Sequence, residues 1–506
     1  MANTEPAKKG RKKKRILIVT PEITYLPQGM GNMANHLQAK AGGLADVSAS
    51  LAAALYKQGA DVHVALPHYR QMFSVNVGRF INEELRIYKS KMPEDRIHLA
   101  EDRIFYYRNN VYDNYAATNM ELALTFQREV INNIIPRVNP DLVHCNDWMT
   151  GLVPAVASRL GIKSLFTLHN IHSLKTTVEH IEKTGIDCRE FWGNLYYDRM
   201  PQSFDESYGD NYVDFLSTGI FASDYINTVS PRFLAEIVEE QHSFVKPNIL
   251  KEITHKVQQG QAEGVLNSPD PSYSPQTDTA IEFQFGPADA AAGKAKNKKV
   301  FQEYLGLDVD PDAALFFWPS RLDPMQKGCQ LLTEILHSVC TRYQNPRVQI
   351  VLVANGPYQV HFHEIVERHE LHRSVSVSAF DERVSRMAYA SADYVFMPSL
   401  FEPCGLPQMI GPIYGTLPVG RDTGGIHDTI SHVDAAAGTG NGFLFESYDS
   451  AGLAWAIEQA MEFHTLPQKT RDKEIRRIME ESAAQFSHTV TAERYIDIYK
   501  RLLGIS

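Results

Sequence analysis

Short, almost uniformly apolar runs alternate along this chain with longer stretches whose apolar residues recur at helical spacing. In the N-terminal half the runs are RILIVTPE, DVHVALP, DLVHCND, KSLFTLHN and DYINTVS, and VSASLAAALYKQG is typical of the longer stretches. An apolar run without alternation belongs to a strand that is buried on both faces. Helical connections between such strands predict a parallel sheet with helices on both sides.

The alternation stops between about residues 255 and 296, where Pro, Ser, Gly and Ala are frequent, and we expect a connection between domains there. It restarts with ALFFWPS, VQIVLVA, SVSVSAF, DYVFMPS and TLPVGR. The pattern therefore predicts an α/β protein with two Rossmann-like, doubly wound domains and a cleft between them. We place these domains at 15–265 and 266–487. A disordered basic tail (1–14) precedes them, and a C-terminal helix (488–506) is expected to cross back to the N-terminal domain.

Length and composition agree with this division. At 506 residues the chain exceeds one core and should form two or three domains. It is 43% hydrophobic and 22% charged, as in ordinary globular proteins, and has no apolar run long enough for a bilayer. The first residues lack the apolar core of a signal peptide, so a cytoplasmic location is expected. The five cysteines are odd in number and show no C-x-x-C spacing, which argues against a disulfide framework and a zinc site.

Charge is distributed unevenly along the chain. The total is −10, yet residues 1 to 15 carry a net charge of +6, so the remainder is more acidic than the total suggests. An acidic body is a poor match for a nucleic acid. We therefore expect neither a nucleic acid nor a membrane as partner, and interpret the basic arm as a solvated tail.

The residues of interest are those that directly follow each strand, because ligands of such sheets bind beyond the carboxyl ends of the strands. The sequence KAGGLADVSASL, which follows the first strand, is neither a P-loop nor a dinucleotide fingerprint. Gly42 and Gly43 allow close backbone approach, and a helix beginning near Asp46 would aim N–H groups at an anion. An ordinary strand-to-helix turn is an equal alternative. Asp147 suits a helix N-cap, and His169 suits a general base, a hydroxyl partner or a core imidazole.

In the C-terminal half, Arg321 and Lys327 lie in SRLDPMQKG, a turn that precedes a helix. The guanidinium fork and the ammonium point charge together suit a diphosphate, although two solvated loop charges remain an alternative. Glu402 follows YVFMPS, where a carboxylate accepts hydrogen bonds from hydroxyls beside the N–H groups of Gly405 and Leu406. Diphosphate binders next to a hydroxyl-binding carboxylate point to a nucleotide sugar.

Two other chemistries find no support in the sequence. Cys404 has no base nearby in the sequence, so packing is favoured over a nucleophilic role. His169 and His172 are three residues apart, but no carboxylate cluster accompanies them, so no metal site is expected.

Eight motifs occur in an order that resembles one family: KAGGLADV, HCNDWMTGLVPA, TLHNI, NTVSPRFLAEI, GVLNSPD, SRLDPMQKG, SLFEPCGLPQ and RDTGGIHDTI. The order resembles bacterial glycogen synthases and plant starch synthases, which are retaining glucosyltransferases of the GT-B type that usually use ADP-glucose. The resemblance runs from about Ile16 to Leu503. Single motifs are modest signals, whereas eight in order are a strong one.

The resemblance implies roles for individual residues. Arg321 and Lys327 would neutralise the leaving diphosphate, Glu402 would hold glucose hydroxyls, and Phe380 would stack on the base. His169 and Asp147 would line the glucose pocket from the other domain. No metal and no cofactor are implied. The residues expected to bind the donor are Lys40, Gly42, Gly43, Asp46, Asn267, Phe380, Cys404, Gly405, Leu406, Thr423, Gly424 and Gly425.

The sequence departs from the family pattern at several places. Ser268 and Pro269 stand where LNGID is usual, Leu400 replaces the arginine of PSRFEPCG, and HSLKTTVEHI follows HN where a Gln-Gly pair is common. These departures lie mostly near the acceptor and the rim of the cleft, so they bear on the acceptor more than on the reaction.

The expected function is glycogen or starch synthesis: glucose is transferred from ADP-glucose to the non-reducing 4-hydroxyl of an α-1,4-glucan with retention. One alternative is a related transferase that uses UDP-glucose or a different acceptor. Another is a catalytically weak glucan-binding homologue, which the presence of all the expected site residues disfavours. A phosphorylase would need a lysine-bound pyridoxal phosphate, for which no motif is present.

Overall fold

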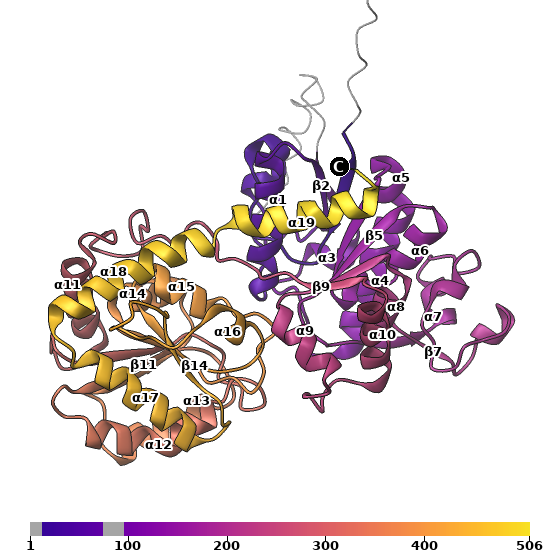
Figure 1. The fold of residues 1–506 in the computed structure, drawn as a ribbon. Helices are drawn as coiled ribbons and strands as arrows, with labels where there is room; N and C mark the ends of the chain where they lie inside the picture. Colours follow the sequence, from indigo (N-terminus) through magenta and orange to yellow (C-terminus); the bar gives the residue numbers. More distant parts are fainter. Residues whose placement is uncertain (1–12, 74–95, 506) are drawn as a thin grey trace, which may run out of the picture. The chain divides into compact units, whose positions relative to one another are not determined.

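The computed structural model describes residues 13–73 and 96–505. Most of the predicted basic tail therefore lies outside the described residues. Contacts divide the chain into two compact units, which are coloured along the sequence in Figure 1. The first unit contains residues 1–227, 246–262 and 492–506, and the second contains residues 228–245 and 263–491.

The first unit is built on a seven-stranded sheet in the order β3-β2-β1-β4-β5-β8-β9. Strand β1 pairs in parallel with both β2 and β4, so the order reverses beside β1, where such sheets bind ligands. The inner strands are buried almost completely, as their apolar runs predict. The strands are β1 (Arg15–Val19), β2 (Asp61–Pro67), β3 (Ile97–Ala100), β4 (Leu142–Asn146), β5 (Lys163–Leu168), β8 (Tyr225–Thr228) and β9 (Ala262–Gly264).

Helices and a small antiparallel ribbon complete this unit. The ribbon joins β6 (Lys175–Thr177) to β7 (Tyr212–Asp214). The larger helices are α1 (Gly43–Lys57), α4 (Ala116–Glu129), α6 (Val153–Arg159), α8 (Phe215–Ala222), α10 (Pro247–Gln258) and α19 (His488–Leu503). Short helices are α3 (Arg103–Tyr106), α5 (Ile135–Val138) and α7 (Val178–Lys183).

The C-terminal helix α19 is fixed to the first unit by buried hydroxyls. The Tyr495 hydroxyl accepts a hydrogen bond from Asn227 Nδ2 (3.0 Å), and the Tyr499 hydroxyl lies 2.8 Å from His144 Nδ1. Both tyrosines are buried. These contacts explain why residues from Ala492 onward belong to the first unit although they end the chain.

The second unit is built on a six-stranded, wholly parallel sheet in the order β12-β11-β10-β13-β14-β15. On one face Phe316, Trp318 and Leu352 pack with helices α12 and α17, and on the other Leu315 and Phe317 pack with α11 and α14. The strands are β10 (Ala314–Trp318), β11 (Val348–Val353), β12 (Val375–Ser378), β13 (Tyr394–Met397), β14 (Leu417–Arg421) and β15 (Phe443–Phe445). The helices are α9 (Pro231–Val238), α11 (Ala290–Leu305), α12 (Cys329–Arg342), α13 (Gln359–Arg368), α14 (Glu382–Ser391), α15 (Pro407–Ile413), α16 (Gly424–Thr429), α17 (Ser450–His464) and α18 (Gln468–Gln485).

The expectation of two α/β domains with parallel sheets is thus confirmed, but three local expectations were wrong. Helix α1 begins at Gly43 rather than near Asp46. The segment from 255 to 296 is not simply a connection, because α10 continues to Gln258 and α11 begins at Ala290. Residues 228–245 pack with the second unit although the sequence places them before its boundary.

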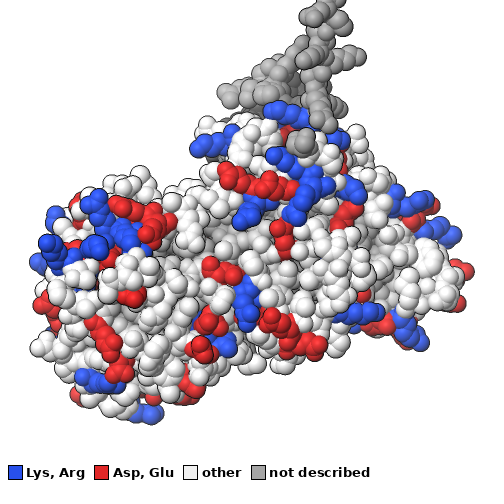
Figure 2. Space-filling view, viewed as in Figure 1, with Lys and Arg blue, Asp and Glu red and all other residues white. Residues whose placement is uncertain are grey.

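Among the helices of the described chain, none has both the length and the apolarity needed to span a bilayer. Figure 2 shows basic and acidic side chains interspersed over the visible face of the described residues.

Candidate functional site

The expected site residues of the first unit follow three neighbouring strands. The glycine turn comes after β1, Asp147 directly after β4, and His169 directly after β5. Because these strands are parallel neighbours, their carboxyl ends meet at one edge of the sheet. The fold thereby brings the three segments together at the point where the strand order reverses.

Glu22, which the sequence analysis missed, holds the glycine turn. Its Oε2 accepts hydrogen bonds from the N–H groups of Ala41 (2.8 Å) and Gly42 (2.9 Å). Burial raises the pKa of the Glu22 carboxyl, and these N–H groups partly oppose that shift. The N–H groups of Ala41 and Gly42 are therefore engaged by the protein and are not available to an anion at this turn. The sequence did contain a signal for Glu22: it is a carboxylate three residues beyond an apolar strand, and ligand-binding residues gather just after such strands.

The turn has an open side and a charged side. A Cβ added to Gly42 would meet no atom within 4 Å, so space remains in front of its backbone. Lys40 Nζ lies 2.8 Å from a carboxylate oxygen of Asp46 in the first turn of α1. The lysine is thus held beside the open glycine, where its charge can face an anionic ligand.

Asp147 connects the ends of β4 and β5. Its Oδ1 accepts from the N–H of His169 (2.7 Å), and its Oδ2 accepts from Asn170 Nδ2 (3.0 Å). Its backbone has a left-handed φ of 57°, which is uncommon outside glycine. Asp147 does occupy the N-cap position of the short 3-10 helix Trp148–Thr150, but its side chain makes no capping hydrogen bond there. Burial raises the pKa of this carboxyl to about 7.

His169 is held as a neutral imidazole. Burial lowers its pKa to about 3. Its Nε2 lies 2.9 Å from Asn146 Oδ1, and Asn146 donates its amide to the carbonyl of Val19, which fixes the amide orientation. Nε2 therefore carries the proton and Nδ1 presents a lone pair. Of the three roles considered for this residue, that arrangement suits a hydroxyl partner.

In the second unit, Lys327 and Glu402 form an ion pair. Lys327 Nζ lies 2.6 Å from Glu402 Oε2, and the hydroxyl of Ser399 donates to the same oxygen at 3.0 Å. Gly328 permits this approach, because it has a φ of 72° and a Cβ there would lie 2.1 Å from the carbonyl of Pro398. The Lys327 ammonium therefore neutralises a carboxylate before any ligand binds.

Arg321 is separate from that pair. Its side chain is exposed, and it makes no ion pair or side-chain hydrogen bond with the residues that the structure describes. It follows β10, whereas Glu402 follows the neighbouring strand β13. An exposed guanidinium without an ion pair to the described residues can bind a diphosphate without first breaking an internal contact.

The turn after Glu402 offers backbone donors. Gly405 has a φ of 75°, and within the described ranges no acceptor is recorded for its N–H or for that of Leu406. Cys404 is buried against Val229 and Met409, and burial raises the pKa of its thiol to about 12. Packing, as preferred from the sequence, accounts for this cysteine. Asn267 lies against it, and the Asn267 Oδ1 is buried without a hydrogen-bond donor from the described residues.

Thr423, Gly424 and Gly425 lie directly against the Glu402 turn. The N–H of Gly425 donates to the carbonyl of Glu402 at 2.9 Å. A Cβ on Gly424 would lie 2.0 Å from that same carbonyl. The Thr423 hydroxyl and the Gly424 N–H both donate to Glu236. The recorded donor groups of this segment are therefore engaged by protein, which favours a role in shaping the site over direct contact with a ligand.

The residues along the edge of the second sheet follow a chemical order. Phe380, half exposed, comes after β12, and its N–H donates to Asn355 Oδ1 after β11. Arg321 comes after β10 and Glu402 after β13, which are the next strands in the sheet. An aromatic ring, a cation and a carboxylate thus succeed one another along one edge.

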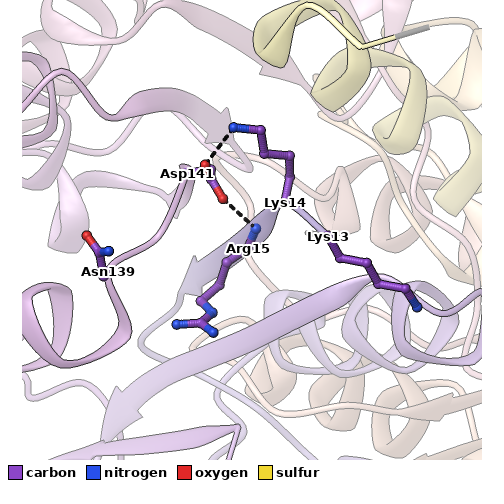
Figure 3. A pocket seen from close by; sticks show the side chains of 5 residues that line it. All are labelled: Lys13, Lys14, Arg15, Asn139 and Asp141. Atoms are coloured by element: carbon purple, nitrogen blue, oxygen red, sulfur yellow. Dashed lines mark hydrogen bonds and ion pairs between the residues drawn. The ribbon is translucent and has the colours of Figure 1, made fainter. Parts of the chain in front are cut away.

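The pocket in Figure 3 lies elsewhere. It is lined by Lys13, Lys14, Arg15, Asn139 and Asp141, at the amino ends of β1 and β4. Asp141 pairs with Lys14 Nζ at 2.8 Å and accepts from the backbone N–H of Arg15 at 2.9 Å. This pocket therefore lies at the opposite edge of the first sheet from the expected site.

No group of three or more His, Cys, Asp or Glu side chains suitable for a metal ion is present in the described parts of the chain. Two units built on parallel α/β sheets, with the candidate ligand-binding residues at the ends of their strands, are typical of glycosyltransferases of the GT-B type. Comparison with known proteins supports the assignment to the glycosyltransferases. Residues 15–267 match the family model of the starch synthase catalytic domain, and residues 306–477 match that of glycosyl transferases group 1. The chain belongs to the family of glycogen and starch synthases, which confirms the resemblance seen in its motifs.

Individual relatives cover nearly the whole chain. The glycogen synthase of Clostridium perfringens is 31% identical over 92% of this chain and 96% of its own length. That of Lactobacillus acidophilus is 32% identical over 92% of this chain and 97% of its own. Among solved structures, the catalytic domain of starch synthase IV from Arabidopsis thaliana, bound to ADP and acarbose, matches with a TM-score of 0.76. It is 24% identical and covers 97% of this chain and 100% of its own, so it supports the fold.

Proposed function

We propose that this glycosyltransferase is a glycogen or starch synthase that transfers glucose from ADP-glucose to the non-reducing 4-hydroxyl of an α-1,4-glucan, with retention of configuration. The observation that carries the proposal is the order Phe380, Arg321, Glu402 along the edge of the second sheet. It matches the order base, diphosphate, sugar within one nucleotide sugar. Curated relatives named glycogen synthase support the reaction.

The donor binds with its base on Phe380 and its diphosphate beside Arg321. Glu402 accepts hydrogen bonds from glucose hydroxyls, and the N–H groups of Gly405 and Leu406 donate to the same end of the molecule. The Lys327 ammonium, whose Nζ lies 2.6 Å from Glu402, interacts with both the carboxylate and the donor phosphate. Charge that develops on the leaving phosphate is stabilised by fixed cations, which is the largest contribution such sites make.

The first unit supplies the remaining groups. The open backbone at Gly42 and the ammonium of Lys40 approach the diphosphate, and the Nδ1 lone pair of His169 accepts from a glucose hydroxyl. Asp147 fixes the turn that carries His169, since both of its oxygens accept hydrogen bonds from residues 169 and 170. Its contribution is therefore the position of the imidazole.

The reaction proceeds by attack of the acceptor on the face that the phosphate leaves. Retaining glycosidases use a second carboxylate as a covalent nucleophile. Asp147 is poorly suited to that role, because it is buried and both oxygens are engaged. The leaving phosphate oxygen accepts the proton of the attacking 4-hydroxyl, so the oxocarbenium-like centre is quenched without a covalent enzyme intermediate.

The donor is the part of the proposal that most needs a test. The starch synthase IV structure contains ADP, whereas another structural relative, HepE of Anabaena, was solved with UDP-glucose at 15% identity and a TM-score of 0.54. We would incubate the protein with labelled ADP-glucose or UDP-glucose and a glycogen primer, and measure label in the precipitated glucan. Incorporation from ADP-glucose supports the proposal. Incorporation from UDP-glucose alone refutes the assigned donor, and none from either refutes the reaction.

A further inference from the structure

Glu236, on helix α9, is buried in the second unit and has four polar partners there. It is 2% exposed. Its Oε1 accepts from the N–H of Gly424 at 2.9 Å and from Arg232 Nε at 3.2 Å. Its Oε2 lies 2.9 Å from His242 Nε2 and accepts from the hydroxyl of Thr423 at 3.2 Å. Burial alone would raise its pKa, but the His242 and Gly424 hydrogen bonds outweigh it, so the pKa is lowered and the group stays ionised.

Helices α9 and α16 cap each other. Glu236 of α9 binds the first N–H of α16, at Gly424, and Asp428 of α16 accepts at 3.0 Å from the N–H of Arg232 in the first turn of α9. Asp428 also accepts from the hydroxyl of Ser230, the N-cap of α9. Negative charge at a helix N-terminus is stabilising. The two helices are therefore held in one relative position by reciprocal ionic caps.

This pair of helices touches the sugar-binding turn. The N–H of Gly425, next to the residue that Glu236 holds, donates to the backbone carbonyl of Glu402 at 2.9 Å. The ring of Phe401, the residue before Glu402, lies 4.1 Å from that of Phe244, which in turn stacks on His242. Glu236 thus reaches the Glu402 segment by two routes, through α16 and through His242.

We propose that Glu236 is a positioning residue for sugar recognition: it fixes α16 and thereby the backbone that aims the Glu402 carboxylate at the glucose of the donor. The inference rests on the proposed function, in which Glu402 binds glucose. The contacts of α9 with α16 also hold residues 228–245 on the second unit, to which they belong. A residue that acts on the glucose end alone should leave nucleotide binding unchanged.

The test compares ADP-glucose with ADP, which lacks the glucose. Affinities of both ligands would be measured by titration calorimetry without glucan for the wild type, Glu236→Ala, Glu236→Gln and Glu402→Ala. We expect Glu236→Ala to weaken the affinity for ADP-glucose about tenfold, because it removes hydrogen bonds to a charged group. The affinity for ADP should change less than about twofold. Glu236→Gln keeps an acceptor for the Gly424 N–H and should recover part of the loss. Thermal unfolding reports whether each variant is folded.

A matched control is Glu239→Ala at the end of the same helix. The Glu239 side chain is 51% exposed, pairs with Arg232 at 3.6 Å and accepts from Gln241 Nε2 at 2.7 Å, and no hydrogen bond or ion pair to α16 is recorded for it within the described ranges. It should leave both affinities unchanged. The inference would be overturned if Glu236→Ala and Glu236→Gln weakened the binding of ADP and of ADP-glucose equally. It would also be overturned if they weakened the binding of neither ligand. If Glu402→Ala itself fails to weaken ADP-glucose selectively, the fault lies with the proposed function and not with Glu236 alone.

Discussion

The ammonium of Lys327 lies 2.6 Å from the carboxylate of Glu402, whereas the guanidinium of Arg321, six residues earlier, has no ion pair with any residue that the structure describes. The two cations that the sequence analysis treated as equivalent are therefore in different electrostatic states before the donor binds. Their replacement should have different consequences, and this difference can be measured.

Replacing Arg321 by alanine should reduce turnover without affecting stability. Its interaction with the diphosphate is strongest when charge develops in the transition state, so kcat should fall about 10²–10³-fold. Because the side chain is exposed and unpaired, the midpoint of thermal unfolding should not change. Steady-state kinetics with ADP-glucose and glycogen, together with calorimetry, check both parts. A kcat close to that of the wild type would show that Arg321 is only a surface charge.

Replacing Lys327 by alanine should reduce both turnover and stability. The Lys327 and Glu402 side chains are 13% and 6% exposed, so loss of the lysine leaves a largely buried carboxylate without its counter-charge. We expect a loss of about 2 kcal/mol in the free energy of unfolding, measured with denaturant. The double variant Lys327→Ala/Glu402→Ala should recover part of this loss, because it removes both charges. Equal stability of Lys327→Ala and the wild type would contradict the importance of the ion pair.

Two glycines among the residues expected to bind the donor should respond in opposite ways to alanine. A Cβ on Gly424 would lie 2.0 Å from the Glu402 carbonyl at a φ of 45°, so Gly424→Ala should destabilise the second unit by more than about 1 kcal/mol. A Cβ on Gly42 meets nothing within 4 Å, so Gly42→Ala should unfold at the wild-type temperature. If the space at Gly42 belongs to the donor, this variant should instead raise the KM for ADP-glucose. An unchanged KM would exclude the glycine turn from the donor site.

Removal of divalent metal should leave activity intact. The described residues offer no metal-binding cluster, and Arg321 and Lys327 provide positive charge for the diphosphate. Activity measured after dialysis against a chelator should equal that with added Mg²⁺. Complete dependence on Mg²⁺ would mean that the two cations are insufficient.

The strands were predictable because strands of parallel sheets are buried on both faces and read as continuous apolar runs. The run DVHVALP coincides with β2, Asp61–Pro67, and VQIVLV coincides with β11, Val348–Val353. Since ligand-binding residues follow such strands, the positions of Asp147, His169 and Glu402 at strand ends were predictable as well.

The contacts that hold those residues were not predictable. Glu22 precedes its partner Ala41 by 19 residues, and Glu236 precedes Gly424 by 188. Each is one carboxylate among many, and nothing in its local sequence indicates which distant N–H group it binds. Likewise the pattern showed a cation at Lys327 and an anion at Glu402, but only the approach of two loops at Gly328 pairs them.

The pH dependence of stability should reveal the buried carboxyl of Asp147. In the unfolded chain this group titrates near its usual pKa of about 4. In the folded protein burial raises the pKa to about 7. Between these values the folded state retains a proton that the unfolded state has released, so the contribution of Asp147 to the free energy of unfolding falls as pH rises from about 4 to about 7. Above pH 7 the contribution is constant.

Asp147→Asn does not titrate and should lack this dependence, so the comparison isolates Asp147 from other groups. The contribution of His169 to the free energy of unfolding has the opposite sign, because its lowered pKa makes stability rise with pH up to about 6.5. That contribution is present in both the wild type and Asp147→Asn, so it cancels in the comparison. Denaturant unfolding at pH 5, 6, 7 and 8 should therefore show the wild type losing stability relative to the variant up to pH 7, by at most about 1.4 kcal/mol per pH unit. The difference should then level off. A constant difference from pH 5 to pH 8 would mean that Asp147 is already ionised at pH 5, and its hydrogen bonds to the His169 turn would then outweigh burial.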